Sequence, residues 1–184
     1  MDFETFEKNK TGYEEYYSIV KDIMENETVQ QMKKYRQHYD TNTYEHCFHV
    51  SYMNYKICKA LHLDYKSAAR AGMLHDLFLY DWRRSRKELN LEGYHAFIHP
   101  KIAYRNASAI FDLNKKEKDI ILKHMWPLTF FHFPKYPESF IITISDKCSA
   151  LYESFSYYKR KLFKKDKSCI EKSNVKETEE IKQN

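Results

Sequence analysis

The sequence predicts an all-α protein, and three observations support this fold class. The 184 residues include only three glycines and four prolines, so few positions break a helix. Apolar residues recur in several segments with a period of about 3.6 residues, which is typical of helices that bury one face. No segment shows the alternation of apolar and polar residues that predicts a strand. A chain of this length buries roughly 70% of its extended surface, so a single core is sufficient.

Four helices are predicted in the first half of the chain: 13–25, 27–38, 43–61 and 65–78. In the first and third of these, apolar side chains recur every three or four residues. Asn26 can cap the second helix and Asp64 the fourth, because their side chains accept hydrogen bonds from the free N–H groups of a first turn. The fourth helix also carries small residues that permit close contact with a neighbouring helix: Ala68, Ala69, Ala71 and Gly72.

The region 79–98 shows no regular pattern, and two more helices are predicted after it. Pro100 fits the first turn of a helix over about 100–111, because that turn leaves its N–H groups unbonded and a proline lacks one. Asn114, with a glutamate three positions later, resembles a capping box and begins a helix over 115–125.

The last part of the predicted domain consists of a loop and a long helix. Residues 126–137 (WPLTFFHFPKYP) predict an aromatic loop, and Pro137 begins the helix, whose apolar residues share one face. After about residue 163 the chain is polar, and we expect it to fray. The predicted organisation is therefore one domain over 1–163 and a disordered tail over 164–184.

Composition excludes several kinds of function. No two glycines lie within twenty residues of each other, whereas phosphate-cradling loops need two or three within about six positions. No apolar run approaches the roughly 18 residues of a membrane span. The charged start MDFETFEKNK lacks the apolar core of a signal peptide, and the four cysteines form no CxxC pair. We therefore expect a cytoplasmic protein with reduced thiols and no membrane partner.

The formal net charge of +5 is concentrated near the C-terminus. Residues 159–184 hold nine basic and five acidic side chains, and the rest of the chain is nearly neutral. The stretch 159–167 (KRKLFKKDK) could contact nucleic acid, but a solvated helix end is the simpler interpretation. The body lacks the basic, aromatic-interleaved pattern of nucleic-acid binders, so we expect no such partner.

Nine histidines are many for this length, and several lie near predicted helix ends together with aspartates. A single histidine on an amphipathic helix is more often a packed or a surface residue. The segment ARAGMLHDL is more informative, because burying Asp76 beside apolar residues is costly unless a cation pairs with it. Imidazole nitrogens and carboxylate oxygens together suit divalent metals. The candidate metal ligands are His46, His75, Asp76, His99, His124 and Asp146.

The order of these ligands resembles the HD superfamily of metal-dependent phosphohydrolases over residues 43–155. The segment EHCFHV around His46 is similar to the first histidine motif of the family, LHD to its name-giving doublet, and SDKCSALYE around Asp146 to its closing helix. His99 and His124 resemble the additional histidines of members that bind two metals. The resemblance implies an HD-domain helical bundle, which agrees with the predicted fold class.

The resemblance also implies one or two divalent ions and assigns roles to the ligands. His46, His75, Asp76 and Asp146 are expected to hold the first ion, and Asp76 to bridge to a second ion held by His99 and His124. The identity of the metal stays open among Fe, Mn, Ni, Co, Zn and Mg. A bound ion lowers the pKa of its water towards about 7 and so supplies hydroxide at neutral pH.

The implied activity is hydrolysis of a phosphoester or phosphoanhydride in a nucleotide or another small phosphorylated metabolite. Asp76, His75 and Lys147 are the expected catalytic residues, because Lys147 directly follows a ligand and can neutralise charge on a phosphoryl group. Two further cations, Lys101 and Arg105, lie one helical turn apart after His99 and could bind phosphate.

Aromatic residues near the ligands have a functional and a packing interpretation. Trp126 and Phe130 could stack on a base, or they could only pack in the loop. His95 lies four residues before a ligand and could line the pocket or bind metal. His49 fits a supporting or a surface position, and His132 fits an aromatic cap or simple packing. We interpret Cys47 as a packing residue.

Two other functions use the same ligands. Some HD-fold proteins hold two irons with a similar set and activate oxygen, so a di-iron oxygenase is the first alternative. A non-catalytic metal-binding or nucleotide-sensing module is the second. Hydrolysis is favoured because it is commoner in the superfamily. Both a monomer and a homodimer agree with the sequence.

Overall fold

The predicted all-α fold is confirmed in the part of the chain that the structure describes. A computed structural model describes residues 10–84, 87 and 92–181, with side chains from 12 to 161 within these ranges. Apart from one short hairpin, the regular elements are helical. In chain order they are α2 (Lys10–Met24), α3 (Glu27–Gln30), the 3-10 helix η1 (Gln31–Lys34), β1 (Arg36–His38), β2 (Thr41–Asn42), α4 (Thr43–Ala60), α5 (Tyr65–Leu74), α6 (His95–Ser108), α7 (Lys115–Lys123) and α8 (Pro137–Ile181).

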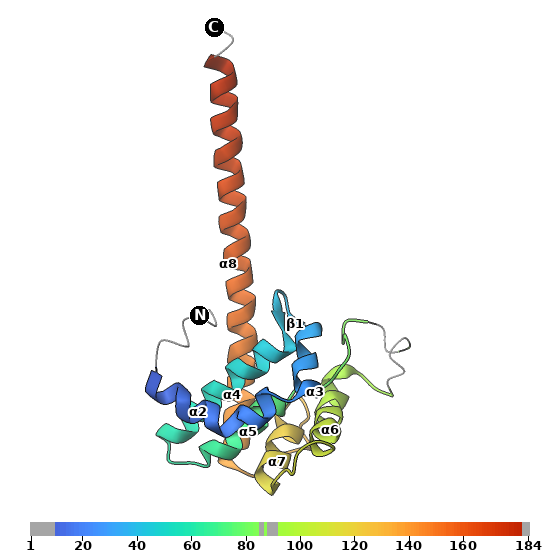
Figure 1. Cartoon of the computed structure of the whole chain (residues 1–184). Helices are drawn as coiled ribbons and strands as arrows, with labels where there is room; N and C mark the ends of the chain where they lie inside the picture. Colours follow the sequence, from blue (N-terminus) through green and yellow to red (C-terminus); the bar gives the residue numbers. More distant parts are fainter. Residues whose placement is uncertain (1–9, 85–86, 88–91, 182–184) are drawn as a thin grey trace.

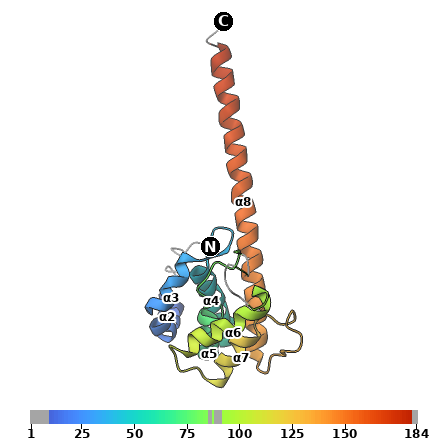
Figure 2. The same ribbon diagram turned by 90° about the vertical axis from the view of Figure 1, so that its right-hand side faces the viewer.

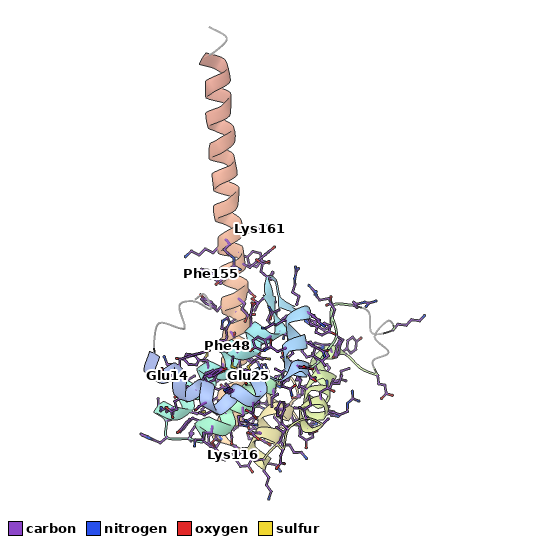
Figure 3. All side chains as sticks on the ribbon, viewed as in Figure 1. Glu14, Glu25, Phe48, Lys116, Phe155 and Lys161 are labelled. Carbon is purple, nitrogen blue, oxygen red and sulfur yellow. The ribbon has the colours of Figure 1, made fainter. Side chains whose placement is uncertain are left out.

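Helix α8 organises the arrangement of these elements. Its first part packs against α4, α5 and α7, and its remainder extends away from them as a single rod (Figures 1 and 2). Phe155 and Lys161 lie on the stretch where the helix leaves the bundle (Figure 3), and Phe155 is 68% exposed. The backbone stays helical to Ile181, whereas the sequence predicts fraying after 163. The side chains of 162–181 and all of 182–184 lie outside the described residues, so the domain boundary stays a prediction.

Three of the helix starts follow the predicted caps. The Asn26 side chain accepts hydrogen bonds from the first turn of α3, and the Asp64 side chain accepts one from the Ser67 N–H at the start of α5. Asn114 and Glu117 form a complete capping box at α7. Local side-chain chemistry therefore fixes where these helices begin.

The predicted helix over 27–38 is wrong in its second half. The α-helix ends at Gln30, the 3-10 helix continues to Lys34, and residues 36–38 pair antiparallel with 41–42. The Thr43 N–H and hydroxyl both donate to the Tyr35 carbonyl, which draws the chain back on itself. Tyr39 makes the tight turn with a φ of 48°, in the left-handed region. The hairpin thus replaces a last helical turn.

The contact between α4 and α5 forms the centre of the core. Gly72 of α5 lies so close to Ser51 of α4 that an added Cβ would be 2.7 Å from the Ser51 Cα. The Ser51 hydroxyl accepts from the Tyr16 hydroxyl at 2.9 Å and donates to the Ala69 carbonyl at 2.6 Å. Large buried side chains surround this crossing, among them Tyr16, Phe48, Met73 and Leu74. The small-residue stripe of α5 therefore permits the close approach that the sequence predicts.

Two boundaries matter for the candidate ligands. Helix α5 ends at Leu74, so His75 and Asp76 lie in the turn after it and not within a helix running to 78. Helix α6 begins at His95, earlier than the predicted position near 100, which places His95 and His99 one turn apart on one helix. No helix among the described residues is both long and apolar enough to span a membrane.

Candidate metal centre

The six predicted ligands converge from five separate places in the chain. His46 comes from α4, His75 and Asp76 from the turn after α5, His99 from α6, His124 from the C-terminal end of α7, and Asp146 from α8. The four histidines and Asp76 are buried, and the Asp146 side chain is 15% exposed. The packing of these helices therefore brings together ligands that lie up to 100 residues apart.

The first group of ligands surrounds one oxygen of Asp146. Its Oδ1 lies 3.0 Å from Nε2 of His46 and 3.7 Å from Nε2 of His75. On the other side of His75, the Oδ2 of Asp76 lies 3.7 Å from the same Nε2. The ligand atoms of His46, His75 and Asp76 all lie within 4.8 Å of one another. The two imidazole nitrogens and the Asp76 carboxylate thus form one compact group, and Asp146 lies beside its two histidines.

The second group surrounds the other oxygen of Asp76. Its Oδ1 lies 3.3 Å from Nε2 of His99 and 3.5 Å from Nε2 of His124. The two imidazole nitrogens are 2.7 Å apart. Asp76 therefore points one oxygen towards each group of histidines. This is the arrangement expected of a carboxylate that bridges two ions.

Each histidine ligand is oriented by a hydrogen bond at its other nitrogen. The Nδ1 atoms of His75, His99 and His124 each lie 2.8 Å from a backbone carbonyl of the preceding turn. Because a carbonyl only accepts, each Nδ1 must carry the proton. The Nδ1 of His46 instead lies 2.9 Å from the Glu153 carboxylate. All four rings therefore turn Nε2, the nitrogen that can ligate a metal, towards the centre.

The donor set fits metal ions. With Nδ1 protonated on both rings, Nε2 of His99 and Nε2 of His124 face each other at 2.7 Å, so a proton or a metal ion has to lie between them. Among the described residues, Nε2 of His75 and Oδ1 of Asp76 are buried without a hydrogen-bond partner. Buried polar atoms of native proteins are nearly always satisfied. Divalent ions bound by these atoms would satisfy both and offset the charge of the two aspartates.

The charges of the site follow from burial and from the neighbouring ligands. Burial alone would raise the pKa of Asp76, but the His75 and His99 rings outweigh it and hold that pKa well below its usual range. Burial and the neighbouring His99 lower the pKa of His124 to about 3. Asp76 is therefore ionised and His124 neutral at pH 7, which are the states that bind metal.

His46 shows the opposite tendency. Burial lowers its pKa, but hydrogen bonds to Asp146 and Glu153 outweigh that effect and raise the pKa to about 10. In the metal-free protein a proton on Nε2 thus occupies the place of a metal between His46 and Asp146. A metal ion binding there displaces that proton.

Two residues that support the ligands are absent from the sequence-based prediction. Glu153 orients His46 and is itself held by the Ser149 hydroxyl at 3.0 Å. It lies seven residues after Asp146, two turns along the same helix face, so helical periodicity is the signal that identifies it. Gln37 donates from Nε2 to Oδ2 of Asp76 at 2.6 Å. Gln37 belongs to the hairpin, which the sequence does not predict.

The predicted substrate contacts lie in different surroundings. Lys147 is half-buried and its Nζ lies 3.4 Å from the His124 carbonyl, beside the second group of ligands. Lys101 and Arg105 are exposed on α6, and Trp126 packs edge-on against Phe133 and Phe140 of the aromatic loop and α8. Among the described residues, none of these three has a hydrogen bond or an ion pair with a ligand. Their roles stay predictions.

Four further histidines have different surroundings. His95 stacks on the His99 ring with centroids 4.5 Å apart, so it lies directly behind a ligand. His38, which belongs to no motif of the sequence, meets His46 edge-on at 5.3 Å. His49 is half-buried, and His132 is exposed. Cys47 is buried in the core, in agreement with a packing role.

Removing the Glu153 carboxylate is expected to weaken metal binding. Glu153→Ala leaves the buried Nδ1 of His46 without its acceptor, so we expect about a 10–100-fold loss of affinity for the first ion. Titration of metal-free protein with a divalent metal measures this loss. The matched control is Glu14→Ala, which removes an exposed carboxylate from α2. Equal affinities in the Glu153→Ala and wild-type proteins would contradict the positioning role.

Comparison with known proteins agrees with this geometry. The model of the HD domain family matches residues 43–151, a range that contains all six candidate ligands. Neither the comparison with curated proteins nor that with solved structures found a match. The matched range covers more than half of the chain, from the start of α4 to the part of α8 that carries Asp146. The chain therefore belongs to the HD domain family, a superfamily of metal-dependent phosphohydrolases.

Proposed function

We propose that this protein is a metal-dependent hydrolase that cleaves a phosphoester or phosphoanhydride bond in a nucleotide or another small phosphorylated metabolite. The observation that carries the proposal is the bridging position of Asp76. Its Oδ2 faces His75 at 3.7 Å, and its Oδ1 faces His99 and His124 at 3.3 and 3.5 Å. Such a ligand set suits two ions that share one carboxylate.

The bound ions would supply an acidified water molecule and would polarise the phosphoryl oxygens. The residues of the chain then have separate tasks. Asp76 and Asp146 would offset the charge of the ions, and the histidines would hold them through Nε2. Lys147, whose Nζ lies 3.4 Å from the His124 carbonyl, would pair with negative charge that develops on the phosphoryl group. His75, which lies between the two aspartates, would contribute as a ligand.

Metal content tests the two-ion arrangement. We expect purified protein to contain about one to two transition-metal ions per chain, and His99→Ala to lose the ion of the second group while the first group keeps its own. Elemental analysis by plasma mass spectrometry measures both. His132→Ala, an exposed histidine of the aromatic loop, is the control and should keep the wild-type content. An unchanged metal content in His99→Ala would contradict the second site.

Activity separates hydrolysis from the two alternatives. A phosphate-release screen with Mn, Co or Mg should cover mononucleotides, dinucleoside polyphosphates, cyclic nucleotides and sugar phosphates. Release of phosphate supports the proposal. Two irons in the isolated protein together with oxygen consumption would instead support an oxygenase, because the same nitrogen and oxygen ligands suit iron. Metal binding without turnover of any of these compounds would support a non-catalytic module.

A further inference from the structure

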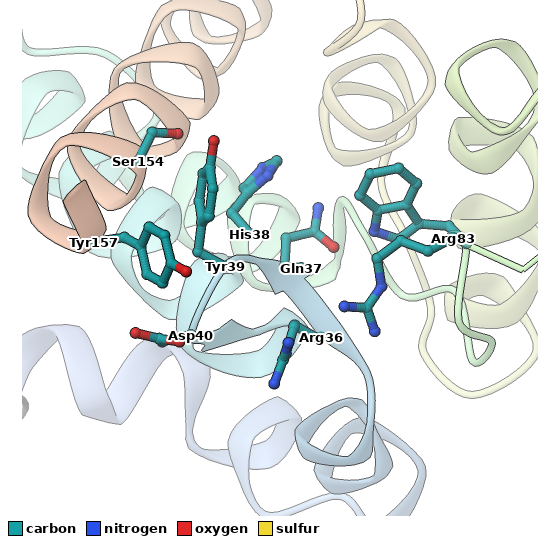
Figure 4. A pocket seen from close by; sticks show the side chains of 9 residues that line it. Arg36, Gln37, His38, Tyr39, Asp40, Arg83, Ser154 and Tyr157 are labelled. Carbon is teal, nitrogen blue, oxygen red and sulfur yellow. The ribbon is translucent and has the colours of Figure 1, made fainter. Parts of the chain in front are cut away.

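A pocket of about 450 Å³ lies beside the metal centre. The hairpin, the segment after α5 and helix α8 form its walls, as Figure 4 shows. Its size lies within the usual range of small-molecule sites. The lining residues are Arg36, Gln37, His38, Tyr39, Asp40, Trp82, Arg83, Ser154 and Tyr157.

One wall of the pocket is in direct contact with the ligands. Gln37 donates to Oδ2 of Asp76 at 2.6 Å, and the His38 ring packs edge-on against His46 at 5.3 Å. Trp82 stacks on His95, whose ring in turn stacks on His99. Gln37 and His38 thus lie between the pocket and the first group of ligands, and Trp82 and His95 lie between the pocket and His99. The pocket is therefore adjacent to the metal centre on the side of Gln37 and His38.

Two arginines give the pocket its charge. Arg36 is exposed on β1, and among the described residues no acidic group pairs with it. Arg83 is held by Asp81, whose two oxygens accept from Nε and one Nη at 2.8 Å each. This pairing orients the guanidinium and leaves its remaining N–H groups available. In Figure 4, Arg36 and Arg83 lie on one side of the pocket, and Ser154 and Tyr157 lie on the other.

The acidic residue of the pocket does not cancel this charge. Asp40 lies near Tyr157, on the side away from Arg83 (Figure 4), and its Oδ2 is 3.4 Å from a guanidinium nitrogen of Arg160. The side near Gln37 thus carries two guanidinium groups. Guanidinium groups match the geometry of phosphate and bind it through paired hydrogen bonds.

The turn of the hairpin is built at a conformational cost. Tyr39 has a φ of 48°, a region that glycine and asparagine adopt more readily than a tyrosine does. Its ring stacks on Tyr157 of α8 with centroids 4.5 Å apart, which anchors the hairpin to the helix that carries Asp146. The hairpin is therefore held in place relative to the metal ligands.

We propose that this pocket binds a non-scissile phosphate of the substrate, with Arg36 and Arg83 as its ligands. The substrate class is then a compound with at least two phosphate groups, one at the metal centre and one in the pocket. This inference rests on the proposed hydrolase function. It adds a criterion for substrate specificity, because the two arginines do not increase the affinity for a compound with a single phosphate.

Binding of pyrophosphate and of orthophosphate tests the inference directly, because the two probes differ by one phosphate group. With manganese-loaded protein at a fixed free metal concentration, we expect wild-type protein to bind pyrophosphate at least about tenfold more tightly than orthophosphate. Arg36→Ala combined with Arg83→Ala should remove this preference and change orthophosphate affinity less than about twofold. Isothermal titration calorimetry measures both affinities. Arg36→Lys should retain part of the preference, since lysine keeps the charge and loses the paired geometry.

Arg84→Ala is the matched control. It removes the same charge from an exposed position next to Arg83 that does not line the pocket. We expect it to keep the preference for pyrophosphate. Because Arg36, Arg83 and Arg84 are all exposed, circular dichroism spectra of the variants should match that of the wild-type protein.

Kinetics provide the second measurement. The double variant should lower kcat/KM for ADP at least about tenfold and leave that for AMP within about twofold. A wild-type protein without preference for pyrophosphate, or a double variant that keeps the preference, would overturn the assignment of the pocket. A different result would show that the proposed hydrolase function is wrong while the assignment of the pocket is correct. In that case no phosphorylated compound is hydrolysed, while the arginine-dependent preference for pyrophosphate is still measured by calorimetry.

Discussion

Asp76→Asn is expected to remove both metal ions and to lower hydrolysis by roughly a thousandfold, which corresponds to about 4 kcal/mol of activation free energy. The reason is that both oxygens of Asp76 face ligand nitrogens, Oδ2 towards His75 and Oδ1 towards His99 and His124. The asparagine amide has no negative charge, and its NH₂ must face the histidines of either the first or the second group of ligands. One substitution therefore affects both sites.

The asparagine variant is designed to fold. Its side-chain oxygen can still accept the hydrogen bond that Gln37 donates to Asp76 at 2.6 Å. Metal content and the rise in Tm on adding metal should both fall, because stabilisation by a ligand requires binding to the folded state. Asp112→Asn makes the same chemical change at an exposed residue between α6 and α7 and should behave as the wild-type protein does. A wild-type metal content in Asp76→Asn would refute the assignment of the centre.

Gly72→Ala is expected to lower the free energy of unfolding by about 2 kcal/mol, through overpacking at a crowded contact. A Cβ at this position would lie 2.7 Å from the Cα of Ser51 and 3.2 Å from its N and Cβ, so a helix must move. The expected fall in Tm is roughly 4–8 °C for a chain of this size. Thermal unfolding followed by circular dichroism measures it.

The same substitution should also weaken metal binding, because the Gly72 carbonyl accepts from Nδ1 of His75 at 2.8 Å. Gly12→Ala is the control within another helix. An added Cβ there meets nothing within 4 Å, and alanine favours the helix by up to about 1 kcal/mol. Its Tm should be unchanged or slightly higher. Equal Tm values for the Gly72→Ala and Gly12→Ala variants would contradict the close approach of α4 and α5.

The features that local chemistry specifies could be predicted from the sequence. Asn26, Asp64 and Asn114 each cap the helix that they were expected to cap, because a cap depends on residues within one turn. The start of α6 shows the converse. Its N-cap is Tyr94, whose side chain makes no capping hydrogen bond, so the sequence carries no signal there. Pro100, which indicated a later start, lies inside the helix.

Features that depend on distant contacts were harder to predict. Strands of two and three residues are too short to show an alternating pattern, and the hairpin is held by the Tyr35 carbonyl and by packing on α8. The ligand types and their order indicated a metal centre. The separation of the ligands into two groups around Asp76 depends on how five parts of the chain pack. Gln37 and Glu153 complete it, and of these two only Glu153 has a signal in the sequence, its helical spacing from Asp146.

The hydrogen bonds at Nδ1 bear on how the centre tolerates mutation. Three of the four acceptors are carbonyls of the main chain, at Gly72, His95 and Ile121. Every residue type supplies a carbonyl, so no side-chain truncation at these positions deletes the acceptor. Glu153 alone is an acceptor that a single codon change can remove. Among the four residues that orient the histidine ligands, we therefore expect substitutions of Glu153 in α8 to weaken metal binding most. At the other three positions, a substitution should weaken metal binding only if it moves the backbone carbonyl.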